Sequence, residues 1–190
     1  MPEPGRWRCF VAVPLGDVLR GSLAGAADRW RSDPGASALR WTDPDGWHLT
    51  LAFLGATDPA RVPGMVDALS RAAVACDAGA FATGGLGAFP SPGRARVLWY
   101  GIQDRSHALR QLATAVRDRL GMPPDDRFRA HVTLARARRD PVDLRPFLES
   151  AVAPEGVLDV TAIHLMRSHL GRGPARYESL ASVPLGGTSR

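Results

Sequence analysis

The sequence of 190 residues contains no lysine and no asparagine, so all 24 of its basic residues are arginine. Without lysine there is no side chain for a Schiff base or for the covalent lysyl-nucleotide intermediate of an ATP-driven ligase. The phosphate cradle of a P-loop also requires a lysine. These three classes of mechanism are therefore excluded.

Cysteine is scarce too, since only Cys9 and Cys76 occur and they form no CxxC pair. Neither a zinc site nor a disulfide framework is indicated, and a reducing cytoplasm is the compartment we expect. No apolar run approaches the ~18 residues that a membrane span needs, and the first six residues lack the apolar core of a signal peptide. We expect one monomeric domain over residues 1–190, cytoplasmic and without membrane association.

Charge is the first positive feature of the chain. The 24 basic residues exceed the 19 acidic ones, which gives a net charge of +5 with histidine neutral. A guanidinium group offers a planar fork of donors that fits phosphate oxygens, so phosphate-bearing partners are favoured. Much of this arginine also coats solvated helix faces, and the charge alone does not identify a partner.

Hydrophobic periodicity and turn residues divide the chain into two halves of similar plan, about 1–92 and 93–190. The expected strands cover residues 8–15, 38–41, 47–55, 81–89, 96–102, 128–136, 157–166 and 177–183, and the expected helices cover 17–31, 58–77, 106–120 and 143–152. We interpret the chain as an α+β fold. It should be bilobal, with pseudo-twofold duplicated β-α-β-β-α-β halves whose mostly antiparallel sheets line a central cleft.

Each half carries one His-x-Thr-x element on an expected strand, His48-Leu49-Thr50-Leu51 and His131-Val132-Thr133-Leu134. Strand side chains alternate with a period of two, so the histidine and threonine of each element share a face. One such element is a weak signal on its own, because half-buried strands often alternate polar and apolar residues. Two copies at equivalent positions make coincidence the poorer explanation.

Two imidazoles that face a common cleft suit phosphodiester chemistry. A neutral histidine can take a proton from water while a protonated partner delivers one to the leaving oxygen. The ordinary histidine pKa near 6.5 allows both states near neutral pH. We therefore expect His48 and His131 to act as an acid-base pair.

The sequence resembles the two-histidine (2H) phosphoesterases, in particular the RNA 2′,3′-cyclic phosphodiesterases once described as 2′-5′ RNA ligases. The resemblance covers most of the chain, and its segments are residues 8–14, 40–55, 96–101, 128–136 and 165–170 together with Tyr177. Ala130 departs from the pattern, since many relatives have proline before the second histidine. Position 130 points away from the face of His131, so we expect a loss of local rigidity rather than of chemistry.

The resemblance implies a hydrolase without metal or other cofactor that opens a terminal 2′,3′-cyclic phosphate of RNA, or a cyclic nucleotide, to leave a 2′-phosphate. It implies that His48 is the acid and His131 the base, and that Thr50 and Thr133 hydrogen-bond the phosphate oxygens. Arg136 would neutralise the phosphate or hold the second motif in place. On an ideal strand an offset of five from His131 faces the opposite side, so contact requires a bulge or a strand end.

Three alternatives stay open at this point. The same site run backwards would join RNA ends with a 2′-5′ linkage, a related enzyme could act on another small cyclic phosphate or a 2′-5′ oligonucleotide, and a non-catalytic RNA-binding module could use two RRM-like sheets. Simpler roles are assigned to several other residues. We expect a surface position for His107, no metal at His164 and His169, a turn or bulge at residues 84–87, and core packing for most of Trp41, Trp47, Phe53, Trp99 and Tyr100.

Overall fold

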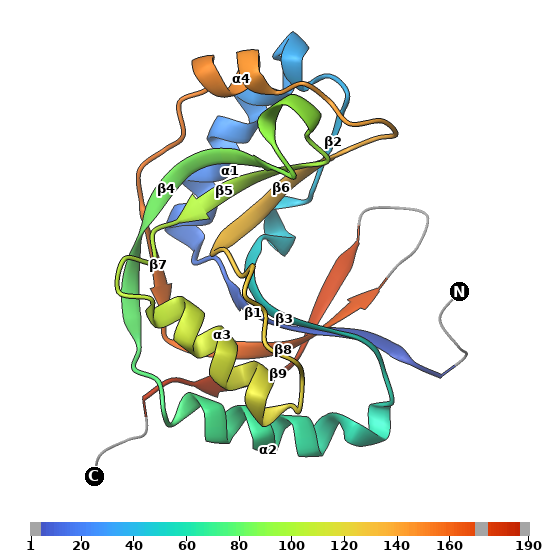
Figure 1. Ribbon diagram of the computed structural model, residues 1–190, viewed down its shortest axis with the longest axis vertical. Helices are drawn as coiled ribbons and strands as arrows, with labels where there is room; N and C mark the ends of the chain where they lie inside the picture. The colour runs from blue at the N-terminus through green and yellow to red at the C-terminus, as the bar shows by residue number, and fades with distance from the viewer. Residues whose placement is uncertain (1–4, 170–174, 187–190) are drawn as a thin grey trace.

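The computed structural model describes residues 5–169 and 175–186 (Figure 1). Residues 1–4 and Leu170, which belong to segments considered above, lie outside the described residues. The strands are β1 (Trp7–Pro14), β2 (Leu39–Trp41), β3 (His48–Thr57), β4 (Gly79–Phe89), β5 (Val97–Ile102), β6 (His131–Ala137), β7 (Val157–Val160), β8 (Ala162–His169) and β9 (Arg176–Pro184). The helices are α1 (Asp17–Arg31), α2 (Val62–Ala73), α3 (Ala108–Arg119) and α4 (Arg145–Ser150).

All nine strands belong to one curled sheet with the order β7-β4-β5-β6-β3-β1-β8-β9, and β2 pairs with β6 outside this path. Every strand pairing in the described part of the chain is antiparallel. The expected α+β fold with antiparallel strands is confirmed.

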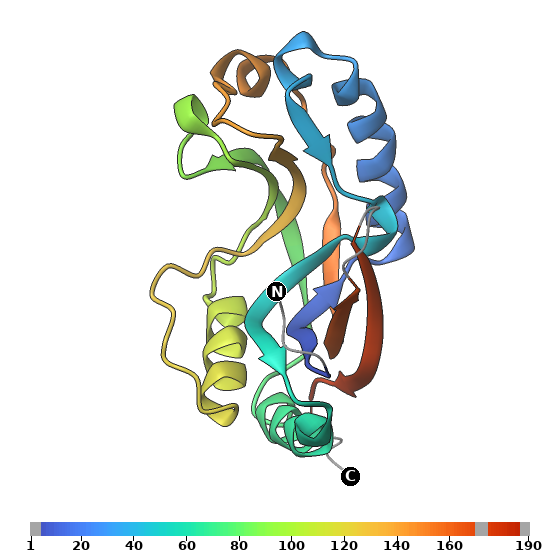
Figure 2. The same cartoon turned by 90° about the vertical axis from the view of Figure 1, so that its right-hand side faces the viewer.

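The sheet has an upper and a lower part, which meet at β6 and β3 (Figures 1 and 2). The upper part contains β7, β4, β5, β6 and β2, with α1 and α4 beside it, whereas α2 and α3 lie with the lower part of β3, β1, β8 and β9. Both parts draw strands from both halves of the chain. Only one residue pair, Leu49 with Val132, links β3 to β6 in the described residues.

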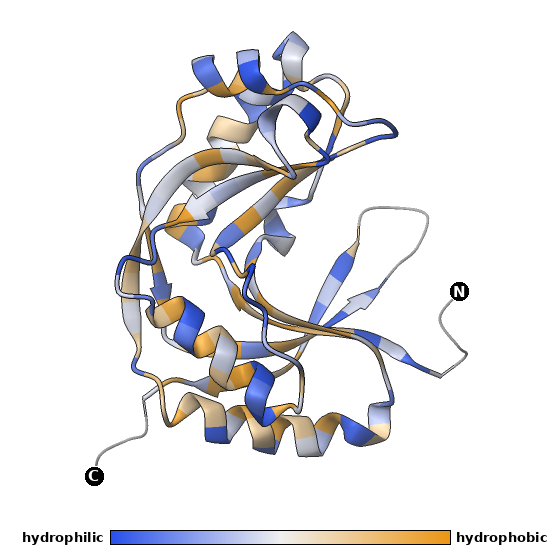
Figure 3. Ribbon diagram, viewed as in Figure 1, coloured by the Kyte–Doolittle hydropathy of each residue, from blue (hydrophilic) through white to orange (hydrophobic). Residues whose placement is uncertain are grey.

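Amphipathic sequences attach the helices to these parts (Figure 3). Helix α2 packs on β8 and β9, and α3 packs on α2 and β3. Their buried residues recur at helical spacing, namely Met65, Ala68, Leu69, Ala72 and Ala73 in α2 and Leu109, Leu112, Ala113 and Val116 in α3. This spacing is the pattern from which both helices were predicted. No helix of the described residues is long and apolar enough to cross a membrane.

One detail of the expected order is wrong. The second half runs β-α-β-α-β-β-β, because the segment expected as one strand over 157–166 breaks at Thr161 into β7, which pairs with β4, and β8, which pairs with β1. The chain passes there from the upper to the lower part of the sheet. Strand β2 pairs with β6 and not with the strand that follows it. The internal duplication itself stays a prediction.

The glycines at residues 84–87 form an irregularity between β4 and β5, as expected for a bulge. Thr83 pairs with Ile102 and Leu86 with Tyr100, so Gly84 and Gly85 lie opposite the single residue Gly101 and β4 has one extra residue. Gly85 has a φ of +74°, a conformation that favours glycine. The segment is therefore a local bend in a strand and not a phosphate loop.

Candidate active site

The two His-x-Thr elements meet where β3 pairs with β6. Leu49 lies opposite Val132, and both side chains are fully buried. In an antiparallel pair the flanking positions then lie opposite each other on the other face, His48 with Thr133 and Thr50 with His131. The two histidines occupy diagonal positions, whose backbones are about 7–8 Å apart in such a pair. Four polar side chains from distant segments thus form one cluster.

Both imidazoles are held in the same way by the main chain. Nδ1 of His48 lies 2.6 Å from the carbonyl oxygen of Gly46, and Nδ1 of His131 lies 2.6 Å from that of Arg129. A carbonyl oxygen only accepts hydrogen bonds, so Nδ1 of each ring carries the proton and donates it. Nε2 is therefore the nitrogen that binds or releases a proton in each ring.

The pKa of each histidine is lowered from its ordinary value. For His48 the largest cause is burial, and the positive charges of His131 and Arg136 lower the pKa further, against the opposing effect of the Gly46 carbonyl. Burial also dominates at His131, where Arg136 adds to the shift and the Arg129 carbonyl opposes it. Both effects destabilise the charged imidazolium in the free protein.

Aromatic rings confine the two imidazoles. The ring of His48 lies 4.7 Å from Phe10 and 5.1 Å from Tyr177, measured between centroids. His131 lies 5.0 Å from Phe89, edge to face, and 6.3 Å from Trp99. These rings exclude water from one side of each imidazole, which accounts for the effect of burial on the pKa values.

A bulge in each strand turns the residue five positions after the histidine onto the face of the site. In β6 the register shifts by one residue between the pairs Trp99–Thr133 and Leu98–Ala135, which leaves Leu134 as an extra residue. Leu134 and Ala135 are both buried, and Arg136 then has the same orientation as Thr133. The bulge that direct contact by Arg136 requires is present.

Strand β3 has the same irregularity at the equivalent place. Ala12 pairs with Thr50 and Val11 with Ala52, so Leu51 is the extra residue. The residue that it turns onto the face of the site is Phe53. The two motifs therefore share a backbone plan in which position five after the histidine is Phe53 in one and Arg136 in the other.

The segment before the first histidine supports the bulge of the second motif. The backbone N–H of Thr42 donates to the Leu134 carbonyl at 2.8 Å, and the Thr42 hydroxyl donates to the same oxygen at 2.7 Å. The buried indole of Trp47 donates in turn to the Thr42 hydroxyl at 2.8 Å. Because the carbonyl that a bulge leaves out of the ladder needs a donor, Thr42 and Trp47 help to hold Arg136 in orientation.

A cavity of about 480 Å³ opens over this cluster. Four of the five residues expected in the site line it, namely His48, Thr50, Thr133 and Arg136. His131 is not among the lining residues, although it faces Thr50 across the strand pair and its charge lowers the pKa of His48. Arg8 and Arg40 also line the cavity and add positive charge.

Sequence reasoning missed some of these lining residues. Phe53 was expected in the core, but its side chain is 63% exposed and lines the cavity, because the bulge at Leu51 turns it outward. Trp47 and Tyr100 are buried as expected. The signal for Phe53 was available, since it follows His48 at the offset at which Arg136 follows His131. Arg40 gave no such signal, because its place depends on the pairing of β2 with β6.

The other histidines lie outside the cluster. His107 is exposed at the start of α3, as expected. His164 lies within hydrogen-bond distance of Ser179 and Ser182, and Nε2 of His169 lies 2.8 Å from the Glu178 carboxylate. Within residues 5–169 and 175–186, no three side chains of His, Cys, Asp or Glu are placed to hold a metal ion.

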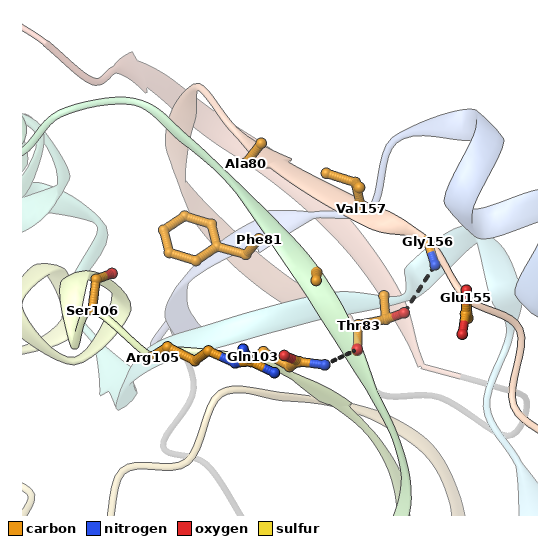
Figure 4. Close-up of a pocket in the computed structure, with 10 residues that line it drawn as sticks. Ala80, Phe81, Thr83, Gln103, Arg105, Ser106, Glu155, Gly156 and Val157 are labelled. Atoms are coloured by element: carbon orange, nitrogen blue, oxygen red, sulfur yellow. Dashed lines mark hydrogen bonds between the residues drawn. The ribbon is translucent and has the colours of Figure 1, made fainter.

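A larger hollow, of about 850 Å³, lies elsewhere on β4 and the segment before β7 (Figure 4). Some of its polar groups bind one another: the Thr83 hydroxyl accepts from the Gly156 N–H at 2.9 Å, and the Thr83 carbonyl accepts from the Gln103 amide at 2.8 Å. Neither histidine of the two motifs lines it. The cavity above β3 and β6 is therefore the better candidate for the active site.

Comparison with known proteins shows which family the chain belongs to. The sequence profile described as LigT-like phosphoesterase matches residues 15–99, which include the first motif. The RNA 2′,3′-cyclic phosphodiesterase of Archaeoglobus fulgidus is 32% identical over 135 residues, 70% of this chain and 73% of the relative. The protein of that name from Geobacillus stearothermophilus is 30% identical over 183 residues, and the alignment covers 93% of this chain but only 56% of the relative.

Solved structures give the same result. The apo crystal structure of E. coli LigT superimposes with a TM-score of 0.73 at 26% identity, and the alignment covers 96% of this chain and 99% of LigT. The structure of LigT in complex with 3′-AMP has a TM-score of 0.71 at 25% identity, with the same coverage. The likeness thus extends over 96% of this chain.

Proposed function

The chain belongs to the LigT-like phosphoesterase family, and from this premise we propose that it hydrolyses 2′,3′-cyclic phosphate ends of RNA to 2′-phosphates. The relatives named as RNA 2′,3′-cyclic phosphodiesterases support the substrate class. We further propose that His48 and His131 serve as general acid and general base and that no metal takes part.

One observation carries the proposal, the equivalent fixation of the two imidazoles on adjacent strands. Each Nδ1 donates to the carbonyl two residues earlier, so each Nε2 is left for proton transfer. The proposal places the phosphate group between the two Nε2 atoms. A pair of proton-transfer groups on opposite sides of one phosphorus is the requirement of in-line displacement.

The proposed reaction begins with the base. Nε2 of His131 takes a proton from water as the water oxygen attacks phosphorus, and the bond from phosphorus to O3′ breaks on the opposite side. Nε2–H of the His48 imidazolium gives its proton to O3′, so the products are a 2′-phosphate and a 3′-hydroxyl. The negative charge of the bound phosphate favours the imidazolium and so opposes the lowered pKa of His48 in the free protein.

The remaining cluster residues would stabilise the charge that develops on the phosphate. Thr50 and Thr133 lie opposite the histidines and line the same cavity, so their hydroxyls can donate to the non-bridging oxygens. Arg136 supplies a cation from the same face. Donors fixed before the reaction cost little reorganisation when the charge appears.

A leaving group that needs no proton tests the two roles. With such a substrate, His48→Ala should recover most of the activity that it loses with a 2′,3′-cyclic nucleotide, whereas His131→Ala should not. Recovery in His131→Ala instead would reverse the roles. Recovery in neither variant would contradict acid catalysis by either histidine.

The direction of the reaction needs a separate assay. Single-turnover hydrolysis and joining are compared on one RNA with a cyclic phosphate end, in the presence of a second RNA with a free 5′-hydroxyl. We expect hydrolysis to be faster, because water is present at far higher concentration. Joining that outpaces hydrolysis would overturn the assignment, and a 3′-phosphate product would contradict cleavage at O3′.

A further inference from the structure

A row of arginines continues from the cavity along β6 and β2. Arg136 and Arg138 follow the bulge of β6, and Arg40 lies directly opposite Arg136 on β2. The backbone N–H of Arg138 donates to the carbonyl of Ala38 at 3.1 Å, so the ladder extends to this residue. Strand alternation then places Arg138 on the face of Arg136 and Arg40, which is the face of the active site.

The positive charge of this row is not neutralised by any ion pair within residues 5–169 and 175–186. Arg40, Arg136 and Arg138 are exposed, and none of them forms an ion pair or a side-chain hydrogen bond with the described part of the chain. Arg31 and Arg145, in contrast, each have a carboxylate oxygen at 2.6 Å. Three guanidinium groups on one strand pair repel one another, and a polyanion on that face would relieve the repulsion.

We propose that Arg40 and Arg138 bind backbone phosphates of the RNA strand that leads to the cyclic end, beside Arg136, which faces the reacting phosphate. The proposal rests on the proposed function, because it takes the cyclic phosphate to lie between His48 and His131. An RNA that ends in a cyclic phosphate continues only through the 5′ oxygen of its last nucleotide, so the strand must leave the cavity along one wall. The arginine row on β6 and β2 gives one side of the cavity a positive charge.

The spacing of the row fits a strand rather than a single nucleotide. Arg136 and Arg138 are two residues apart, about 6.6 Å along a strand, a distance that one extended nucleotide can bridge. Arg40 and Arg136 line the cavity, whereas Arg138 lies beyond its lining residues. A cyclic mononucleotide would therefore be held by the cavity alone, and only a longer RNA would reach Arg138.

The test compares two substrates, a 2′,3′-cyclic mononucleotide and a short RNA with the same terminal nucleotide. Arg138→Ala should lower kcat/KM for the RNA about three- to tenfold and change kcat/KM for the mononucleotide less than about twofold. The salt dependence of RNA binding, as log Kd against log salt concentration, should flatten by about 0.7 for the lost phosphate contact. Arg138→Lys should keep most of the RNA activity, because the charge remains.

Arg71→Ala is the matched control, since Arg71 is exposed on α2 and α2 packs on the distant strands β8 and β9. Arg71→Ala should leave kcat/KM unchanged for both substrates. Equal losses on both substrates in Arg138→Ala, or equal losses on RNA in Arg71→Ala and Arg138→Ala, would overturn the proposal.

Binding separates this proposal from the proposed function. The anisotropy of a labelled RNA that ends in a 2′-phosphate is measured with wild-type protein and both variants, without turnover. If the wild-type protein hydrolyses neither substrate, the proposed function fails. Weaker RNA binding by Arg138→Ala than by Arg71→Ala would still support RNA binding by the arginine row. Equal affinity of the two variants for the labelled RNA would contradict RNA binding by the arginine row.

Discussion

The two motif strands share a backbone plan but differ in their surroundings. In both strands, the imidazole is fixed by the carbonyl of the residue two positions before the histidine. A bulge residue three positions after the histidine turns the fifth residue after it onto the face of the site. The fifth position is the apolar Phe53 in β3 and the cationic Arg136 in β6. His48 lines the cavity between Phe10 and Tyr177, whereas His131 lies beside Phe89 and Trp99 and does not line it.

This difference shows how the same local backbone structure, present in both strands, can place two imidazoles in different surroundings. The backbone supplies equivalent Nε2 atoms, and the neighbouring strands decide which aromatic rings surround each imidazole. General acid-base catalysis needs such inequality, because one ring must be protonated while the other is neutral.

The largest effect is expected when the imidazole of either motif strand is removed. His48→Ala and His131→Ala should each lower kcat for a 2′,3′-cyclic nucleotide by about 10²–10⁴. His164→Ala is the control, because His164 also lies on a strand and its pKa is also lowered by burial, but it is absent from the cavity lining. If His164→Ala lost as much activity as either motif variant, the result would contradict a specific role of His48 and His131 in the reaction.

The next test addresses the buried residue pair that joins the motifs. Leu49→Ala should lower the free energy of unfolding by about 2–5 kcal/mol and Val132→Ala by about 1–3 kcal/mol, because leucine loses more buried carbon than valine. Both side chains are fully buried. Denaturant unfolding followed by tryptophan fluorescence checks the two values. A change below 0.5 kcal/mol (about the effect of an ordinary surface substitution) in either variant would show that the junction is loosely packed.

The two threonines provide a smaller test of symmetry. Thr50→Val and Thr133→Val keep the side-chain shape but remove the hydroxyl, and each should lower kcat/KM by about 10- to 100-fold, the cost of one hydrogen bond to a charged group. Thr114→Val in α3 is the control. Equal losses would indicate that both hydroxyls bind the phosphate, and a loss confined to one would assign phosphate binding to that strand.

The smallest expected effect concerns pH. Arg136 lowers the pKa of both histidines, so Arg136→Gln should raise both pKa values and move both limbs of the pH profile of kcat/KM to higher pH. NMR titration of the ring protons of His48 and His131 measures the shifts without relying on activity. Arg71→Gln should leave both titrations unchanged, and a downward shift in Arg136→Gln would contradict the sign of the interaction.

Much of the fold follows from local sequence. Helix α1 has the expected bounds, and α2 and α3 lie within the expected ranges, because their apolar residues recur at helical spacing. The candidate site was predicted from a repeated pair of residue types and not from any single residue. Alternation by two then placed His48 with Thr50 and His131 with Thr133 correctly, since each pair precedes the bulge of its strand.

Features that depend on strand pairing were not predictable. The bulges at Leu51 and Leu134 arise from the register with β1 and β5, and strict alternation gives the wrong face for Phe53 and Arg136. The partner of β2 was also missed, because Leu39–Trp41 is only three residues long and its pairing is decided by Thr42 and the bulge of β6. The hydrogen bonds of Thr42 to β6 join segments more than 80 residues apart, about which a local pattern carries no information.

The single pair of Leu49 and Val132 has a consequence for the evolution of such a protein. Because the histidines adjoin the only rung shared by β3 and β6 in the described residues, their separation is set by the dimensions of two paired strands. The outer ends of the strands can lengthen, tilt or acquire new loops without altering the separation of the two imidazoles. Substrate range and chemical step can therefore change separately, and the walls can adapt to larger or smaller phosphate esters while the reaction stays the same.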